Sequence, residues 1–502
     1  MEDNPQEHVE PPATPATPAP EPAARPPRPR RSPFPAARWE AARRPAGRPV
    51  LATVAVAAVL AAGTLTMDRP GLGWLLTGLA LAGVAAAASV ELRVRPDLSR
   101  CLWAAAGIAL LAVGAVRAAD WLYAVCVPAA VACAVQALLP GGSVRAMLAG
   151  ALAGPVAVLR ALPWAGRGLR ALVPHGRPQA AARLLASIGV SGLLLVVFGA
   201  LFASADGAFA GLLARIVPDV DLRGVPGRLF LFVAVALGAL GGAYLVAAPP
   251  RLPDPAEPRR PLRLAEWALP VALLDALFGL FVLVQLTVLF GGRGHVLRPG
   301  GPDFAQYARS GFWQLSAVTG LTLVVIGVVA RAAPRTGRLD RAAIRVLVGA
   351  LAILTLVIVA SALKRMGLYE DTYGYTRLRL AVSATELWLG VLFALVLVAG
   401  VRLRTTWLPR AVLISAVLGL LAFAAADPDR FIAARNVDRF ERTGRVDVFY
   451  LSELSADAAP ELVRLPADRR ADAVAPIRQR LQRDSWYSYN FGRARARTVL
   501  RP

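Results

Sequence analysis

A polar stretch, Leu363–Arg379, lies between two long apolar runs and concentrates the side chains that could do chemistry. It holds four cations, two carboxylates and three tyrosines, and it includes Lys364, the single lysine among 56 Lys and Arg residues. Arginine forks suit phosphate or carboxylate ligands, and tyrosines suit a membrane interface. We therefore expect this stretch to contact an anionic headgroup or an unidentified protein partner at one membrane face. The candidate residues are Arg365, Tyr369, Glu370, Asp371, Tyr373, Arg377 and Arg379.

Two other interpretations of this stretch stay open. It could be an outer loop whose charges satisfy one another, without any ligand. Glu370 and Asp371 could also act as an acid/base pair of a membrane enzyme on a lipid-linked substrate, but sequence neighbours on a loop have no fixed separation.

Three polar residues fall inside apolar runs: Asp275, Gln285 and Glu386. Ionisable groups are costly inside a bilayer, so they are candidates for a proton or ion path and hence for a transporter. The structural alternative, which we favour, is that each carboxylate is paired. Under it, Glu386 pairs with Arg365 or Arg379, and Asp275 pairs with Gln314, Thr319 or Thr322.

Composition excludes several function classes. A net charge of +23 can indicate a nucleic-acid partner, but the arginines lie mostly between apolar runs, which indicates membrane orientation instead. Three cysteines and three scattered histidines do not make a metal set. Walker, HExxH, GxSxG and dinucleotide motifs are absent from the sequence. We therefore expect no nucleic acid, metal or cofactor.

The elements that position these residues are long apolar runs, each of the length that crosses about 30 Å of hydrocarbon. They predict an all-α, polytopic helical membrane bundle of about eleven spans. The expected spans are 50–67, 71–90, 101–117, 120–139, 183–204, 228–248, 265–291, 311–331, 345–363, 380–401 and 408–426.

Three segments lie outside these spans. Residues 1–49, rich in Pro, Ala and Arg, predict a disordered tail before the membrane domain at 50–426. The segment near 144–173 has a short apolar part and is expected to be interfacial or re-entrant. Residues 427–502 predict a small helical tail, with Asp447 and Asp457 as helix caps.

Orientation follows from the distribution of Lys and Arg. The N-terminal tail and the connections on its side together carry 29 such residues, whereas the connections on the opposite side carry 11. Positive residues favour the cytoplasmic side. The bias predicts a protein of the inner or plasma membrane with a cytoplasmic N-terminus. Eleven crossings would then make the C-terminal tail extracytoplasmic.

Several stretches together, in order, resemble a family of bacterial multi-pass membrane proteins that is common in actinobacteria and catalogued only as a domain of unknown function. The resemblance covers about 183–465 and implies an integral membrane protein, with no established reaction or ligand. The matching stretches are Leu201–Asp206, Phe281–Gly292, Tyr307–Leu315, Lys364–Arg379, Asn436–Arg439 and Gly444–Pro460.

The sequence thus favours a non-enzymatic membrane scaffold or signalling component of the envelope that uses its outer polar surface. A transporter built on Asp275 and Glu386 is the first alternative, and a membrane enzyme is the second.

Overall fold

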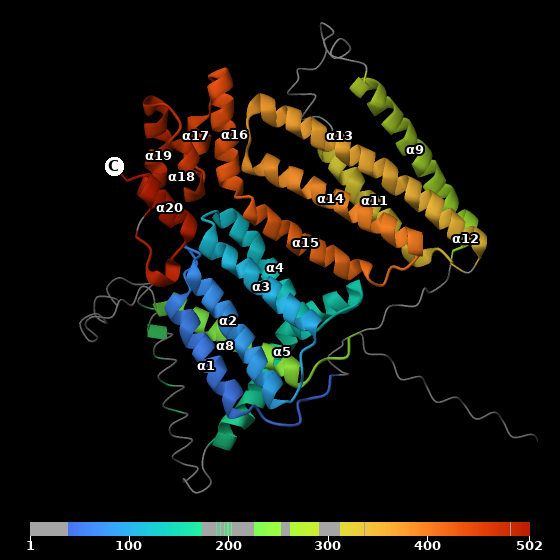
Figure 1. Cartoon of the computed structure of the whole chain (residues 1–502). Helices are drawn as coiled ribbons and strands as arrows, with labels where there is room; N and C mark the ends of the chain where they lie inside the picture. Colours follow the sequence, from blue (N-terminus) through green and yellow to red (C-terminus); the bar gives the residue numbers. More distant parts are fainter. Residues whose placement is uncertain are drawn as a thin grey trace, which may run out of the picture.

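The computed structural model describes residues 39–172, 225–252, 262–290, 312–335, 337–481 and 483–501, together with a few isolated positions between 187 and 202. Helices and turns make up the secondary structure of these residues (Figure 1), which confirms the predicted all-α fold class. The helices described in the bundle are α1 (Arg48–Thr64), α2 (Leu72–Glu91), α3 (Leu98–Val116), α4 (Asp120–Leu138), α5 (Val144–Leu172), α8 (Val225–Ala247), α9 (Leu264–Phe290), α11 (Phe312–Ala332), α12 (Arg338–Ala343), the π-helical turn η3 (Ile344–Val348), α13 (Gly349–Tyr373), α14 (Arg377–Arg402) and α15 (Leu408–Ala425).

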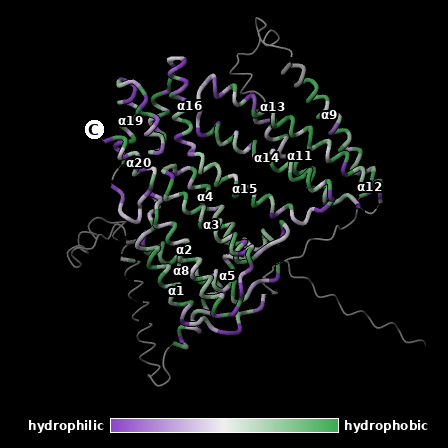
Figure 2. Tube along the Cα trace, viewed as in Figure 1, coloured by the Kyte–Doolittle hydropathy of each residue, from purple (hydrophilic) through white to green (hydrophobic). Residues whose placement is uncertain are grey.

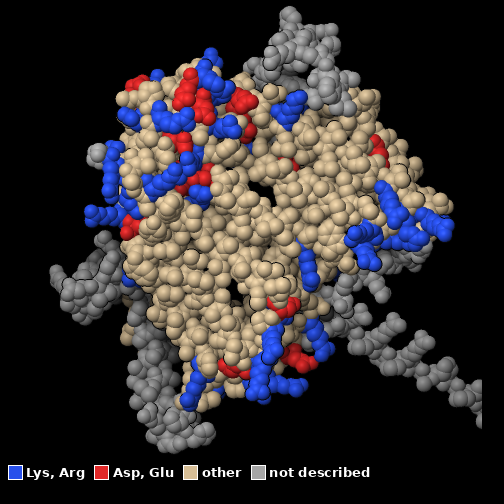
Figure 3. Space-filling view, viewed as in Figure 1, with Lys and Arg blue, Asp and Glu red and all other residues tan. Residues whose placement is uncertain are grey.

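Length and composition show that this is a multi-pass membrane protein. Ten helices in the described part of the chain are long and apolar enough to cross a membrane. Apolar residues run along these helices in Figure 2, and charged side chains gather near the helix ends in Figure 3, with a broad uncharged area between them. About 20 apolar residues in a helix are enough to cross the hydrocarbon layer.

The expected spans and these ten helices differ in three places. α1 is an apolar helix of 17 residues, slightly shorter than the ten. The expected span 183–204 lies almost wholly outside the described residues, as does the tail before residue 39. α5 is among the ten because it is a continuous helix of 29 residues.

The bundle consists of two helix groups joined by α15. The first group contains α1 to α5 and α8, and the second contains α9 and α11 to α14. α15 packs against α14 of the second group and against α3 and α4 of the first (Figure 1). Each group has its own apolar core.

The last nine residues before α1 are packed against the first helix group, so the expectation of disorder up to residue 49 is wrong for them. Trp39 is 8% exposed and donates its indole N–H to the carbonyl of Ala248, at 2.5 Å. The indole of Trp164 in α5 donates to the carbonyl of Arg44 at 2.8 Å. We call residues 39–47 the N-segment, and the end of the bundle that it covers the N-segment end.

Both halves of α5 lie at the N-segment end. Near its start, Gly150 packs against Leu139, which directly follows α4. In its second half, Arg160 donates a hydrogen bond to the carbonyl of Trp39 at 2.6 Å. These contacts support an interfacial placement of α5, which stays a prediction. A re-entrant reversal within α5 is wrong, because the helix runs without a break.

The chain after α15 folds into a small helical unit at the opposite end of the bundle, which we call the cap domain (residues 427–499, from the N-cap residue of α16; Figure 1). It has its own apolar core around Ile432, Leu451 and Leu462. Gly444 ends its first helix with φ +65°. Its helices are α16 (Pro428–Thr443), α17 (Val448–Ser452), η4 (Ala456–Ala458), α18 (Ala459–Leu462), α19 (Ala467–Arg480), η5 (Trp486–Ser488) and α20 (Phe491–Val499).

Candidate functional site

The polar stretch 363–379 is helical over most of its length. α13 continues to Tyr373, and only residues 374–376 separate it from α14. Gly374 has φ +84°, a conformation that favours glycine, and a Cβ there would lie 2.5 Å from Oδ1 of Asn436. The alternative that this stretch is a loop is therefore wrong for residues 363–373, which are helical. The apolar pattern ends near 363, but helix geometry does not require apolar residues, so the helix continues beyond that point.

Arg377 forms the centre of the contact between this turn and the cap domain. Its Nε lies 2.9 Å from Oδ1 of Asp429, and its Nη2 lies 2.5 Å from Oδ2. Asp429 also accepts from the backbone N–H of Ser455 at 2.8 Å, and its side chain is fully buried. Burial alone would raise the pKa of Asp429, but the hydrogen bonds and charge of Arg377 hold it below its usual value. This ion pair therefore stabilises the fold. It engages Arg377, which the sequence suggested as a ligand-binding residue.

Asn436 and Arg439 of α16 form hydrogen bonds with backbone N–H and carbonyl groups of the turn and of the end of α13. The amide side chain of Asn436 accepts from the N–H of Tyr375 at 3.0 Å and donates to its carbonyl at 2.9 Å. Arg439 donates to the carbonyls of Asp371 and Thr372, which lie at the end of α13. The cap domain thus packs on the α13–α14 turn and forms hydrogen bonds with its backbone.

Arg379, Tyr369 and Tyr373 form a second cluster at the end of α13. Arg379 donates to the carbonyls of Tyr373 and Gly374. Its guanidinium carbon lies 4.2 Å from the centre of the Tyr369 ring, which itself packs 4.9 Å from the Tyr373 ring. The arginine therefore caps the carbonyl end of α13 and stacks on tyrosine.

Glu370 and Asp371 are neighbours on α13 with different surroundings. Glu370 is 6% exposed, and its Oε1 has no hydrogen-bond partner among the described residues. Asp371 is exposed and lies 3.4 Å from the Tyr375 hydroxyl. Consecutive helical residues point about 100° apart, so the two carboxylates meet different surroundings.

The cap domain also binds the α3–α4 connection of the first helix group. Arg117 lies 2.7 Å from Asp427, and the N–H of Ala118 donates to the carboxylate of Asp457 at 2.7 Å. The side-chain amide of Asn490 donates to the carbonyls of Gly114 and Arg117, each at 2.8 Å. Polar side chains of the cap domain therefore form hydrogen bonds with backbone groups at helix ends in both helix groups.

The surroundings of Asp457 favour the protonated form of its carboxyl group. Burial raises its pKa to about 7; the nearby carboxylate of Asp427 adds to this, and the hydrogen bond from Ala118 offsets only part of it. The region is helical, as η4 and α18, but the predicted capping role of Asp457 is wrong, because its carboxylate accepts from the N–H of Ala118.

The polar residues inside the bundle have other partners than those expected. Glu386 accepts from the hydroxyl of Ser316, and its second oxygen has no partner in the described chain. Gln285 accepts from Arg365, so the expected Arg365–Glu386 pair is replaced. Both oxygens of Asp275 lack a partner among the described residues, whereas Thr319 and Thr322 donate to carbonyls of their own helix. The structure does not bring Asp275 and Glu386 into contact with each other.

The sequence did not indicate the pairing between the cap domain and the bundle. On the cap-domain side the residues that hold it are Asp427, Asp429, Asn436, Asp457 and Asn490. Their partners lie up to 376 positions away along the chain, so local patterns carried no signal for the pairing. Within the described ranges, no group of three His, Cys, Asp or Glu side chains could hold a metal ion.

Residues 105–465 match the model of a family described as a domain of unknown function (DUF4153). The chain belongs to this family. The matched range begins within α3 and ends after α18, so it includes both the α3–α4 connection and most of the junction with the cap domain. No curated protein and no solved structure matches the chain.

Proposed function

We propose that this family member is a non-enzymatic scaffold of the cell membrane that presents its cap domain to a protein partner on the extracytoplasmic side. The observation that carries the proposal is that the cap domain is bonded to both helix groups at once. Asp429 holds Arg377 of the second group, while Asp457 and Asn490 hold the α3–α4 connection of the first.

These bonds favour a fixed arrangement of the two helix groups. Rocking one group against the other would separate buried charge partners, and breaking such a pair costs about 3–5 kcal/mol. Transport by alternating access depends on that kind of motion. A static platform needs no such motion.

The orientation rests on the arginine distribution together with the positions of the chain ends. The N-segment and the cap domain contact opposite ends of the bundle. Connections at the N-segment side carry most of the basic residues between the helices. The positive-inside rule then assigns the N-segment to the cytoplasm and the cap domain to the outside.

The cap domain offers an apolar contact that a partner could cover. Phe449 on α17 is 76% exposed. Trp486 is 65% exposed but lies beside the α1–α2 connection, where Leu72 donates its N–H to the carbonyl of Tyr489, so it suits the lipid interface better than a protein partner. Exposed aromatic side chains are frequent anchors of protein interfaces.

A photo-crosslinking residue placed at position 449 of the full chain, in its native cells, tests the proposal. A discrete protein adduct is expected from position 449. The matched control is position 339, where Leu339 is 78% exposed on α12 at the other end of the bundle. Lipid adducts alone at 449, or the same protein adduct from 339, would contradict the scaffold role.

Ion or proton movement is a second candidate, favoured by one observation. The buried carboxylates of Glu386 and Asp275 have oxygens without partners in the described chain, and uncompensated carboxylates within a bilayer mark ion paths in many membrane proteins. Proteoliposomes that hold an imposed pH gradient test it. Dissipation that Glu386→Gln and Asp275→Asn both abolish would support the second candidate, and a gradient that persists with the unmodified chain would reject it.

A further inference from the structure

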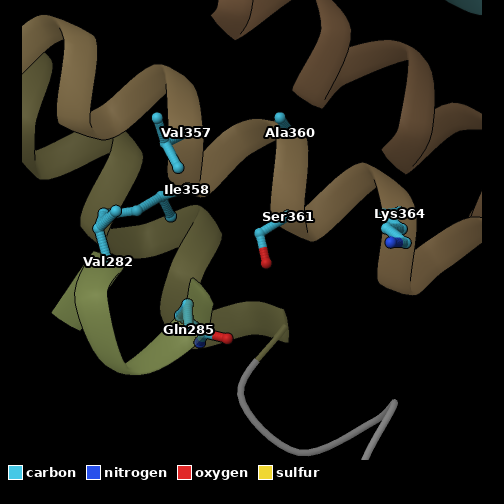
Figure 4. Close-up of a pocket in the computed structure, with 7 residues that line it drawn as sticks. All are labelled: Val282, Gln285, Val357, Ile358, Ala360, Ser361 and Lys364. Carbon is cyan, nitrogen blue, oxygen red and sulfur yellow. The ribbon is translucent and has the colours of Figure 1, made fainter. Parts of the chain in front are cut away.

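A narrow groove runs between α9 and α13 on the second helix group (Figure 4). Its volume is about 190 Å³. Four of its lining residues are apolar, and Gln285, Ser361 and Lys364 supply polar groups. The full lining is Val282, Gln285, Val357, Ile358, Ala360, Ser361 and Lys364.

Lys364 lies where the apolar part of α13 ends. The residues from Val346 to Leu363 are almost all apolar, and 18 helical residues rise about 27 Å, close to the thickness of a hydrocarbon layer. Beyond Lys364 the helix continues for nine residues into the polar junction with the cap domain. Lys364 is therefore at the depth where lipid phosphates lie.

The charge of Lys364 is not neutralised within the described chain. Its side chain is exposed, and none of the ion pairs between described residues includes it. Arg377 differs in this respect, because it is paired with Asp429. The other two arginines at this end of α13 and α14 donate to uncharged oxygens: Arg365 to the side chain of Gln285, and Arg379 to the carbonyl of Tyr373. A phosphate would supply the missing charge.

The wall of the groove suits an acyl chain. Val282, Val357 and Ile358 line it below the lysine, and Ala360 leaves space beside them. Neighbouring side chains outside the groove, such as Leu283 and Ile353, are more than half exposed on apolar helices, as expected for residues that face lipid. A chain of the bilayer can therefore reach the groove laterally, without leaving its leaflet.

We propose that this groove binds an anionic phospholipid of the surrounding bilayer, with its phosphate on the Lys364 ammonium and one acyl chain between α9 and α13. The Ser361 hydroxyl and the Gln285 amide N–H line the same groove and would bond to the glycerol and ester oxygens. This site is separate from the proposed partner surface at Phe449 and does not depend on it.

The single lysine makes a direct test possible, because an amine-reactive acylating reagent can modify only Lys364 and the N-terminal amine. We would reconstitute the full chain in nanodiscs of phosphatidylcholine, with and without phosphatidylglycerol, and follow labelling by peptide mass spectrometry. At ten times the dissociation constant of the lipid, labelling of Lys364 should slow about tenfold relative to the N-terminal amine. Inorganic phosphate added to phosphatidylcholine discs should give no protection.

Two variants separate a site from a general effect of a negative membrane surface. Ala360→Trp fills the groove while keeping Lys364, and should abolish the protection. Ala276→Trp is the matched control, since Ala276 is an exposed alanine of α9 that does not line the groove. If Ala360→Trp does not elute as folded protein, Ala360→Leu takes its place. Equal labelling rates of the unmodified chain in both lipids would overturn the proposal, as would protection that the groove-filling variant retains or that phosphate alone provides.

Discussion

Asp429 of the cap domain and Arg377 at the start of α14 form a two-pronged ion pair, with Nε 2.9 Å from Oδ1, around a carboxylate that is fully buried. The same carboxylate accepts from the indole N–H of Trp121 on α4, at 3.1 Å. One side chain of the cap domain therefore contacts both helix groups. The cap domain behaves as part of the bundle, and its stability should depend on this residue.

Replacing Asp429 by Asn should destabilise the docked cap domain by about 3–5 kcal/mol, because it leaves the half-buried Arg377 without its counter-charge. Limited proteolysis of the detergent-solubilised chain would show this as faster release of the cap domain. The control is Asp468→Asn. Asp468 pairs with Arg469 at 3.4 Å on the surface, with both side chains more than half exposed, so its loss should cost less than about 1 kcal/mol. Equal release rates for the two variants would contradict a structural role for Asp429.

The contribution of Asp457 to cap docking should fall as pH rises. Burial raises the pKa of this carboxyl from 3.8 to about 7, so the folded state binds the proton more tightly than the unfolded state. Its contribution is complete below about pH 4 and is lost as pH rises to about 7. Asp457→Asn removes the titration but keeps an oxygen for the Ala118 N–H. The melting temperature of this variant minus that of the unmodified chain should therefore increase between pH 4 and 8, and a constant difference would refute the effect.

Gly71 is predicted to be required for docking, for a steric reason. A Cβ on Gly71 would lie 2.5 Å from the backbone carbonyl carbon of Ser488, which cannot move as freely as a side chain. Gly71→Ala should therefore push the cap domain away from the α1–α2 connection. Hydrogen exchange should increase at the N–H of Leu72, which donates to Tyr489.

Gly63 provides the matched control on the same helix pair. It lies within α1, and a Cβ there would meet nothing within 4 Å. Ala is a better helix former than Gly by about 0.5–1 kcal/mol, so Gly63→Ala should leave exchange at Leu72 unchanged. Increased exchange in both variants would indicate a general loosening and not a clash at Ser488.

The fold was largely predictable because the apolar composition of a segment indicates that it spans the membrane. Apolar runs of about 20 residues have one stable structure in a bilayer, the helix, since every backbone group must be bonded internally. The boundaries were less predictable. The N-segment has a Pro- and Arg-rich context but packs on the bundle through the buried Trp39 and through backbone carbonyls that accept from Arg160 and Trp164. Composition averages over such a residue and misses it.

For the stretch 363–379, the sequence indicated a dense polar segment but not the residues that its side chains contact, and ligand binding there stays a prediction. The density of polar residues in 363–379 did indicate a specific structure there, and Arg377 is central to it. Its partner, Asp429, lies 52 positions away in another unit, and nothing local distinguishes Asp429 from other acids of the tail. Asn436 shows the same limit, because its role is to bond the backbone of Tyr375 and backbone groups carry no sequence signature.

A reporter that is active only outside the cytoplasm, fused after Pro502, should be active, whereas the same reporter fused after Arg335 should be silent. Arg335 donates to the carbonyl of Leu403 at the connection before α15, and Arg410 of α15 donates to the carbonyl of Gly141 at the N-segment end. The cap domain binds the other end of the bundle. Arg335 and the cap domain therefore lie at opposite ends of the bundle, and the positive-inside rule predicts that Arg335 is cytoplasmic. Equal activity of both fusions would contradict this arrangement, and reversed activities would mean that the cap domain seeks its partner among cytoplasmic proteins.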